Sequence, residues 1–76
     1  MIKINLKLFV TLQKYLPEFS EKFKIPEKTR IGKLIKILGI PKNMVKIIFI
    51  NGIQKKTDYI LKNNDRVGIF PPVGGG

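Results

Sequence analysis

Few side chains of this sequence could carry out chemistry. Its 76 residues include no cysteine and no histidine, so the chain lacks the usual nucleophile, the usual general base near neutral pH and the usual zinc ligands. Its five carboxylates show no spacing typical of a metal-binding loop. We therefore expect a protein that is not an enzyme and that binds no metal or cofactor. The five carboxylates belong to Glu18, Glu21, Glu27, Asp58 and Asp65.

The last six residues differ in composition from the rest of the chain. Two prolines, a valine and three glycines can neither pair regularly nor bury much surface, so we expect a flexible tail after a domain of residues 1–70. When extended, this tail spans at most about 20 Å, which is enough to enter the cleft of another protein. The alternative is a frayed terminus without a role. The tail consists of Pro71, Pro72, Val73, Gly74, Gly75 and Gly76.

Four or five strands must position this tail. From Ile2 to Leu8 apolar and polar side chains alternate, which is the pattern of a strand with one buried face. The second strand is expected to form a hairpin with the first, and Asn51-Gly52 predicts a tight turn between the third and fourth. A turn that includes Asp65 precedes the last strand. The predicted strands cover residues 2–8, 23–25, 45–50, 53–55 and 66–70.

One amphipathic helix is predicted between the second and third strands, because four apolar residues at helical spacing share one face. Thr29 is expected to cap its N-terminus and Gly39 to end it. Gly32 is expected where the helix lies close against the sheet. The element order describes an α+β domain in which a mixed sheet wraps around one main helix. The four apolar positions are Ile31, Leu34, Ile35 and Leu38.

The charge of the chain is strongly basic. Fifteen Lys and Arg residues against five Asp and Glu residues give a net charge of +10, which favours acidic partners, anionic lipid or nucleic acid. The lysines are spread from Lys3 to Lys62 without a dense stripe, so we interpret them as a solvated surface. The longest apolar run, residues 47–50, is far too short to cross a membrane. We expect a cytoplasmic protein with no membrane partner.

The C-terminal part of the sequence resembles one protein family. Residues 61–76 read LKNNDRVGIFPPVGGG and resemble the ending of the MoaD and ThiS sulfur-carrier proteins: an acidic turn, a strand, a Phe-Pro-Pro-Val segment and terminal glycines. The element order of the whole chain is similar to that of the ubiquitin-like β-grasp superfamily, to which these carriers belong. The resemblance implies a β-grasp fold, with a mixed sheet of four to five strands around one main helix.

The resemblance also implies a function for the tail. A partner enzyme would use ATP and Mg to adenylate the carboxylate of Gly76, and a sulfur donor would convert the adenylate to a thiocarboxylate. The rest of the tail, from Pro71 onward, would thread into the partner's active site. The Phe-Pro-Pro-Val segment is closer to MoaD than to ThiS, which favours sulfur donation in the biosynthesis of molybdopterin, the pterin of the molybdenum or tungsten cofactor. The receiving partner would be the large subunit of molybdopterin synthase or another sulfur-accepting enzyme.

Three phenylalanines form the candidate partner-binding patch. Residues 45–50 are apolar on both faces of their strand, so some of these side chains are expected to stay exposed. The resemblance suggests that the patch lies on the sheet face opposite the helix. The alternative is a register that buries the phenylalanine of this strand and exposes its two neighbours. The predicted patch consists of Phe9, Phe49 and Phe70.

Other functions are left open by the sequence. A protein modifier needs the same activated Gly76 but transfers it to a lysine of a target protein. A sulfur carrier could also serve thiamin synthesis or tRNA thiolation. From a different class, the charge of +10 allows a small nucleic-acid-binding module that uses the sheet and its exposed phenylalanines. We do not expect nucleic acid as the partner, because the sequence has no dense basic stripe.

Overall fold

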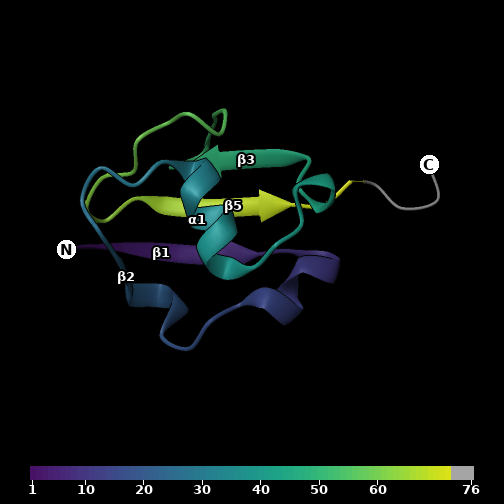
Figure 1. The fold of residues 1–76 in the computed structure, drawn as a ribbon, viewed down its shortest axis with the longest axis horizontal. Helices are drawn as coiled ribbons and strands as arrows, with labels where there is room; N and C mark the ends of the chain where they lie inside the picture. The colour runs from purple at the N-terminus through teal and green to yellow at the C-terminus, as the bar shows by residue number, and fades with distance from the viewer. Residues whose placement is uncertain (73–76) are drawn as a thin grey trace.

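The computed structural model describes residues 1–72. A five-stranded sheet and one α-helix dominate it (Figure 1). Helix α1 covers Ile31–Leu38, and short 3-10 helices cover Val10–Tyr15, Ser20–Lys22 and Lys42–Met44. No helix within residues 1–72 has the length and apolar character needed to cross a membrane. The strands are β1 (Ile2–Leu8), β2 (Phe23–Ile25), β3 (Ile47–Ile50), β4 (Ile53–Gln54) and β5 (Arg66–Phe70).

The sheet is mixed, and β5 lies at its centre. The strand order is β2-β1-β5-β3-β4. β1 pairs antiparallel with β2 and parallel with β5, whereas β3 pairs antiparallel with both β5 and β4. Because β1 and β5 run in parallel, the start of the chain and the end of β5 lie at opposite ends of the sheet (Figure 1). The predicted mixed sheet around one main helix is confirmed.

Helix α1 packs across one face of the sheet and closes the core. In Figure 1 it crosses in front of the central strands. Alternate residues of β1, β3 and β5 point to this face, as the period of two in a strand requires. The buried residues of these three strands are Ile4, Leu6, Leu8, Ile48, Ile50, Val67 and Ile69, and the buried helix residues are Ile31, Leu34 and Ile35.

The two ends of α1 test the sequence predictions separately. The prediction that Gly39 ends the helix is confirmed, because Gly39 adopts the left-handed conformation with φ of 76° and its N–H donates to carbonyl groups of the last turn. The predicted cap at Thr29 is wrong. Arg30 occupies the N-cap position and makes no side-chain capping bond. The Thr29 hydroxyl donates instead to the carbonyl oxygen of Pro26, 2.6 Å away.

The first amides of α1 are satisfied by another part of the backbone, which is why no side-chain cap is needed. The N–H of Ile31 donates to the carbonyl oxygen of Tyr59 at 3.0 Å, and the N–H of Gly32 to that of Thr57 at 2.9 Å. A β-carbon on Gly32 would lie 3.5 Å from the Thr57 oxygen. The close approach expected at Gly32 therefore exists, but to the segment around Thr57 and not to the sheet.

Candidate functional site

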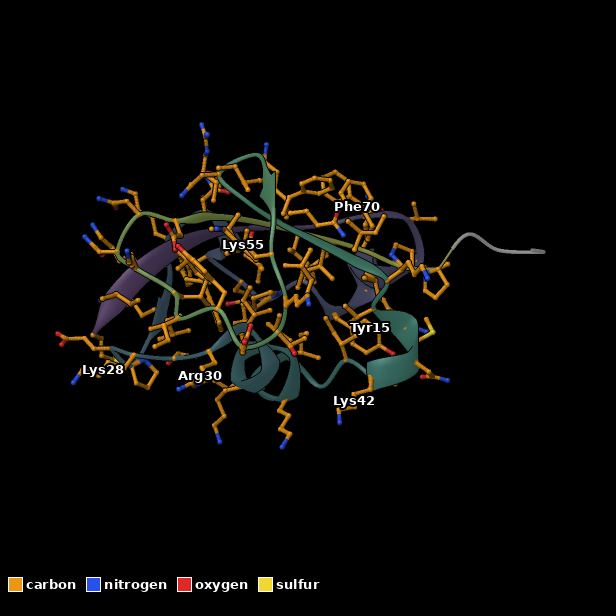
Figure 2. All side chains as sticks on the ribbon, turned by 90° about the horizontal axis from the view of Figure 1, so that it is seen from above. Tyr15, Lys28, Arg30, Lys42, Lys55 and Phe70 are labelled. Atoms are coloured by element: carbon orange, nitrogen blue, oxygen red, sulfur yellow. The ribbon has the colours of Figure 1, made fainter. Side chains whose placement is uncertain are left out.

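Three aromatic rings come together on the sheet face opposite α1. The rings of Phe9 and Phe70 are stacked, with centroids 4.2 Å apart and an interplanar angle of 2°. Phe49 meets Phe70 edge-on, with 5.8 Å between centroids and an interplanar angle of 85°. All three side chains are only half-buried. We call these three residues the aromatic cluster; in Figure 2, Phe70 lies on one side of the sheet and the helix on the other.

The alternation of β3 and β5 produces this cluster. The two isoleucines beside Phe49 are buried in the core, so Phe49 points to the opposite face. Phe70 alternates in the same way with the fully buried Ile69. The register pairs Phe49 with Gly68, which places the Phe49 ring diagonally across from Phe70. The alternative register, with Phe49 in the core, is not the one observed.

Gly68 makes room for the stacked pair. The N–H of Phe9 donates to the carbonyl oxygen of Ile69 at 3.2 Å, which holds Phe9 beside β5. A β-carbon on Gly68 would lie 3.3 Å from the Phe9 ring, closer than an ordinary van der Waals contact. The missing side chain therefore lets the ring lie over β5. This role of Gly68 was not predicted from the sequence, although a glycine inside an apolar strand is the signal that indicates a close approach.

A hollow of about 450 Å³ lies beside the aromatic cluster. Its lining combines the three rings with two exposed cations, Lys7 and Arg66. A half-buried apolar surface bordered by positive charge is complementary to an apolar patch with acidic groups at its rim. The arrangement can bind a protein surface, but it presents no group for covalent chemistry.

The predicted tail begins where the aromatic cluster ends. Phe70 is both the last residue of β5 and the ring that contacts the other two. Pro71 is half-buried and Pro72 is exposed. The chain thus leaves the central strand directly beside the cluster. The remaining predicted tail residues, Val73, Gly74, Gly75 and Gly76, lie outside the described residues.

Asp65 has a larger structural role than the turn expected from the sequence. Its buried carboxylate accepts hydrogen bonds from the Asn51 side-chain amide (2.9 Å), the Tyr59 hydroxyl (3.2 Å) and the backbone N–H of Lys62 (2.9 Å). Asn51 also accepts a bond from the N–H of Arg66 at 2.9 Å. The network ties the β3–β4 turn to the start of β5. It was missed because its members are distant in sequence and meet only in the fold.

Among the titratable groups of residues 1–72, Tyr59 has a shifted pKa. Partial burial raises the pKa of the Tyr59 phenol above its ordinary value of 10.0, and the negative charge of Asp65 and the hydrogen bond to it act in the same direction. Tyr59 therefore stays protonated at neutral pH and remains a donor to Asp65. Within residues 1–72, no three His, Cys, Asp or Glu side chains are grouped closely enough to hold a metal ion.

A comparison with protein families finds one match that covers most of the chain. The model of the ThiS family matches residues 6–76. This range includes the helix, the tail and the whole sheet apart from the first residues of β1. A search of curated proteins finds no match.

Solved structures share the fold over nearly the whole chain. A putative molybdopterin converting factor, subunit 1, from Pyrococcus furiosus is 25% identical with a TM-score of 0.73, and the match covers 96% of this chain and 100% of the other. SAMP1 from Haloferax volcanii (16% identity, TM-score 0.67) matches 97% of this chain and 99% of its own. The HVO 2177 protein of Haloferax volcanii is 19% identical with a TM-score of 0.73, and the match covers 99% of this chain and 87% of the other. The chain therefore belongs to the ThiS family, among the MoaD/ThiS-like ubiquitin-like sulfur carriers.

Proposed function

We propose that this protein is a sulfur carrier whose Gly76 cycles between carboxylate, acyl adenylate and thiocarboxylate. The observation that carries the proposal is the family match, which continues through the glycines to residue 76. The protein would be the substrate of its partners and would not itself be a catalyst. It has no cysteine or histidine that could hold a persulfide or deprotonate an attacking group.

The chemistry requires activation by a partner. A carboxylate is a poor electrophile, because its negative charge is shared by two oxygens. Attack of the Gly76 carboxylate on the α-phosphorus of ATP forms an acyl adenylate and releases pyrophosphate. The outer sulfur of a donor protein's persulfide then attacks the acyl carbon and expels AMP, which gives an acyl disulfide. A thiol attacks the donor's sulfur of this disulfide, so that the thiocarboxylate leaves and a disulfide between the donor and the thiol forms. ATP and Mg would be bound by the activating enzyme and not by this chain.

The aromatic cluster would dock the activating enzyme. Its three half-buried rings provide the apolar centre, and Lys7 and Arg66 provide a charged rim, which is the usual anatomy of an interface. Because Phe70 is followed directly by Pro71, docking at the cluster would direct the residues from Pro71 to Gly76 toward the partner's active site. Glycines without β-carbons would fit a narrow channel there.

The sulfur would be used in molybdopterin biosynthesis. This choice is supported by the 25% identical structure of a putative molybdopterin converting factor subunit and by the Phe-Pro-Pro-Val segment at residues 70–73. The receiving partner would be the large subunit of molybdopterin synthase. A pull-down that recovers a thiamin-synthesis or tRNA-thiolating enzyme in its place would redirect the pathway and leave the carrier chemistry intact.

Intact-mass spectrometry tests the carrier function. The protein, without a C-terminal tag, is incubated with its activating enzyme, ATP-Mg and a sulfur donor. Replacement of one carboxyl oxygen by sulfur raises the mass by about 16 Da. Absence of both adenylate and thiocarboxylate would overturn the proposal, and conjugates to target lysines would identify a protein modifier instead.

Deletion of Gly75 and Gly76 is the matched negative control. The shortened protein ends at Gly74 and should form neither product, because its terminal carboxylate falls about 7 Å short of the position that Gly76 reaches in the partner's active site. Its thermal midpoint should remain almost unchanged, since two glycines have no side chains to contribute to the core. A large drop in the midpoint would mean that the loss of activation reflects unfolding.

A further inference from the structure

A second surface, on the helix side of the molecule, has the composition of a binding groove. A hollow of about 580 Å³ runs along α1 between the segment before the helix and the segment after it. Figure 2 shows Lys28, Arg30 and Lys42 on this side, with Phe70 on the opposite side of the sheet. We call this hollow the basic groove. Five cations line it: Lys28, Arg30, Lys33, Lys36 and Lys42.

The lining of the basic groove contains no carboxylate. Glu27 and Asp58 are the acids closest to it in sequence, and each lines a separate hollow. The Arg30 guanidinium is oriented by a hydrogen bond from its Nη1 to the backbone carbonyl oxygen of Asp58, 3.2 Å away, and this bond does not neutralise its charge. One third of the 15 basic residues of the chain are thus concentrated on this groove. Such a concentration favours an anionic ligand.

The basic groove also has an apolar strip. Ile37 is 45% exposed and lies one turn of α1 beyond Lys33, so the two side chains are neighbours on the helix surface. Ile35 and Ile40 contribute to the lining as well, although most of each side chain is buried. An anion alone would leave this strip in contact with water. A ligand that carries both carboxylates and an apolar side chain would cover it.

We propose that the basic groove binds an acidic, amphipathic segment of a partner protein. The carboxylates would pair with the cations of the groove, and at least one apolar side chain would pack on Ile37. Nucleic acid fits less well, because no aromatic residue lines the groove and single-stranded nucleic acids are bound largely by stacking on aromatic rings. The aromatic rings of the cluster lie on the opposite face of the sheet.

The opposite positions of the two surfaces mean that both can be occupied at once. A partner in the basic groove would not cover Phe9, Phe49 or Phe70 and would leave the end of β5 accessible. The proposal is therefore independent of the sulfur-carrier function. Changes in the groove should leave thiocarboxylate formation intact, and deletion of the last two glycines should leave groove binding intact.

Fluorescence anisotropy with three labelled probes tests the proposal on the full chain at low and at physiological salt. The probes are a peptide of Glu-Glu-Leu repeats, a peptide of the same length and charge with Ser in place of Leu, and a single-stranded RNA. We expect the Leu peptide to bind most tightly and to keep measurable affinity at physiological salt. Equal binding of the two peptides would overturn the amphipathic partner, and tighter binding of RNA would overturn a protein partner.

Two variants locate the binding. Lys33→Glu combined with Lys36→Glu should lower the affinity for the Leu peptide about tenfold, because two attractive contacts become repulsive. The matched control combines Lys3→Glu with Lys24→Glu, an exposed cross-strand pair on β1 and β2 that changes the net charge equally. An equal loss in the control would show a general charge effect and overturn the site.

Ile37→Ser tests the apolar strip. It should lower the affinity for the Leu peptide about fivefold and leave the affinity for the Ser peptide unchanged, because only the Leu peptide buries apolar surface on Ile37. Circular dichroism of each variant establishes that the fold is retained, as expected for substitutions at exposed positions. An unchanged affinity of the Leu peptide for the folded Ile37→Ser variant would remove the apolar strip from the site.

Discussion

The two faces of the sheet receive different side chains from the same strands. On the helix side, β1, β3 and β5 present aliphatic residues that α1 covers, and Ile69 and Leu34 are 0% exposed. On the other side, the next residue of β5, Phe70, is half-buried in a cluster that nothing within residues 1–72 covers fully. The helix face therefore accounts for stability. The open face keeps apolar surface available, which is what a binding site requires.

The difference between the two faces explains why the third strand has no alternation of apolar and polar residues in its sequence. Residues 47–50 are apolar throughout, yet only Ile48 and Ile50 are buried. In a strand with one solvated face, the intervening positions are normally polar. Phe49 occupies such a position, and its apolar character serves the cluster and not the core. The apolar residues of one strand thus divide between folding and recognition.

Removing a contact on the helix side should have the largest effect. Leu34→Ala is expected to lower the free energy of unfolding by about 2–5 kcal/mol, because it leaves a cavity between α1 and the sheet. Urea denaturation measures the loss. Lys33→Ala, at an exposed position one residue away, is the control and should cost less than about 0.5 kcal/mol. A loss below about 1 kcal/mol for Leu34→Ala would contradict the assignment of stability to this face.

Phe70→Ala should affect binding more than stability. We expect the affinity for the activating enzyme to fall by about 2 kcal/mol, or roughly 30-fold, as for an aromatic anchor at an interface. Surface plasmon resonance measures the affinity, and urea denaturation the stability. Phe19→Ala is the matched control, because Phe19 is 83% exposed and lies outside the cluster. If Phe70→Ala unfolds the domain but the folded fraction binds normally, the two faces are not divided as proposed.

The helix side also contains a pH-dependent contact. Since the pKa of Tyr59 is raised in the folded state, the unfolded chain releases the phenol proton first as pH increases. The stabilisation is therefore complete below pH 10.0, the ordinary value, and is lost as pH rises through the folded-state pKa. Urea denaturation from neutral to alkaline pH tests this.

Lysines also titrate in this range, so the comparison is with Tyr59→Phe. That variant loses one hydrogen bond, at a cost of about 1 kcal/mol at neutral pH, and its stability should decrease less steeply above pH 10.0 than that of the unsubstituted protein. Identical pH profiles for the two proteins would exclude Tyr59 as the source of the pH dependence.

Gly68→Ala should have the smallest effect. The new β-carbon would lie 3.3 Å from the Phe9 ring, so the ring must shift, whereas the backbone of a strand gains from the loss of glycine. We expect a net change in stability below about 1 kcal/mol. The Phe9 ring signals should move in the NMR spectrum.

The same Gly68→Ala substitution in a protein that also carries Phe9→Ala isolates the contact between the new methyl group and the Phe9 ring. There the substitution should be neutral or stabilising, because no ring opposes the new methyl group. The same stability change in both backgrounds would show that Gly68 is not required for the stacked pair.

Local signals made much of the fold predictable. The alternation from Ile2 to Leu8, the turn at Asn51-Gly52 and the stop at Gly39 each depend on neighbouring residues, and each is observed. Asn51 and Gly52 both adopt positive φ, as this tight hairpin turn requires. The facing of Phe49 and Phe70 followed from the same alternation, because the residues next to them in their strands, Ile48, Ile50 and Ile69, are buried.

Features that depend on distant residues could not be predicted. Thr29 has the chemistry of a cap, but the amides it would satisfy are bonded to the loop around Thr57, which only the tertiary structure places there. From the sequence, Asp65 was expected to act only in its local turn. Its partner Asn51 lies in the β3–β4 turn, 14 residues earlier, and the two meet only in the fold. The cations of the basic groove are likewise scattered between residues 28 and 42. They line one groove because the segments before and after α1 lie beside the helix in the fold.

The central position of β5 also determines how the domain would respond to mechanical force. A partner that pulls on the chain beyond Phe70 pulls along the axis of β5, which is bonded to β1 on one side and to β3 on the other. Both ladders would then be loaded in shear, with many hydrogen bonds sharing the force, whereas an edge strand could be peeled away one bond at a time. An enzyme could therefore draw the end of this chain tightly into its active site while the body of the carrier remains folded, and force spectroscopy between residues 1 and 72 would measure that resistance.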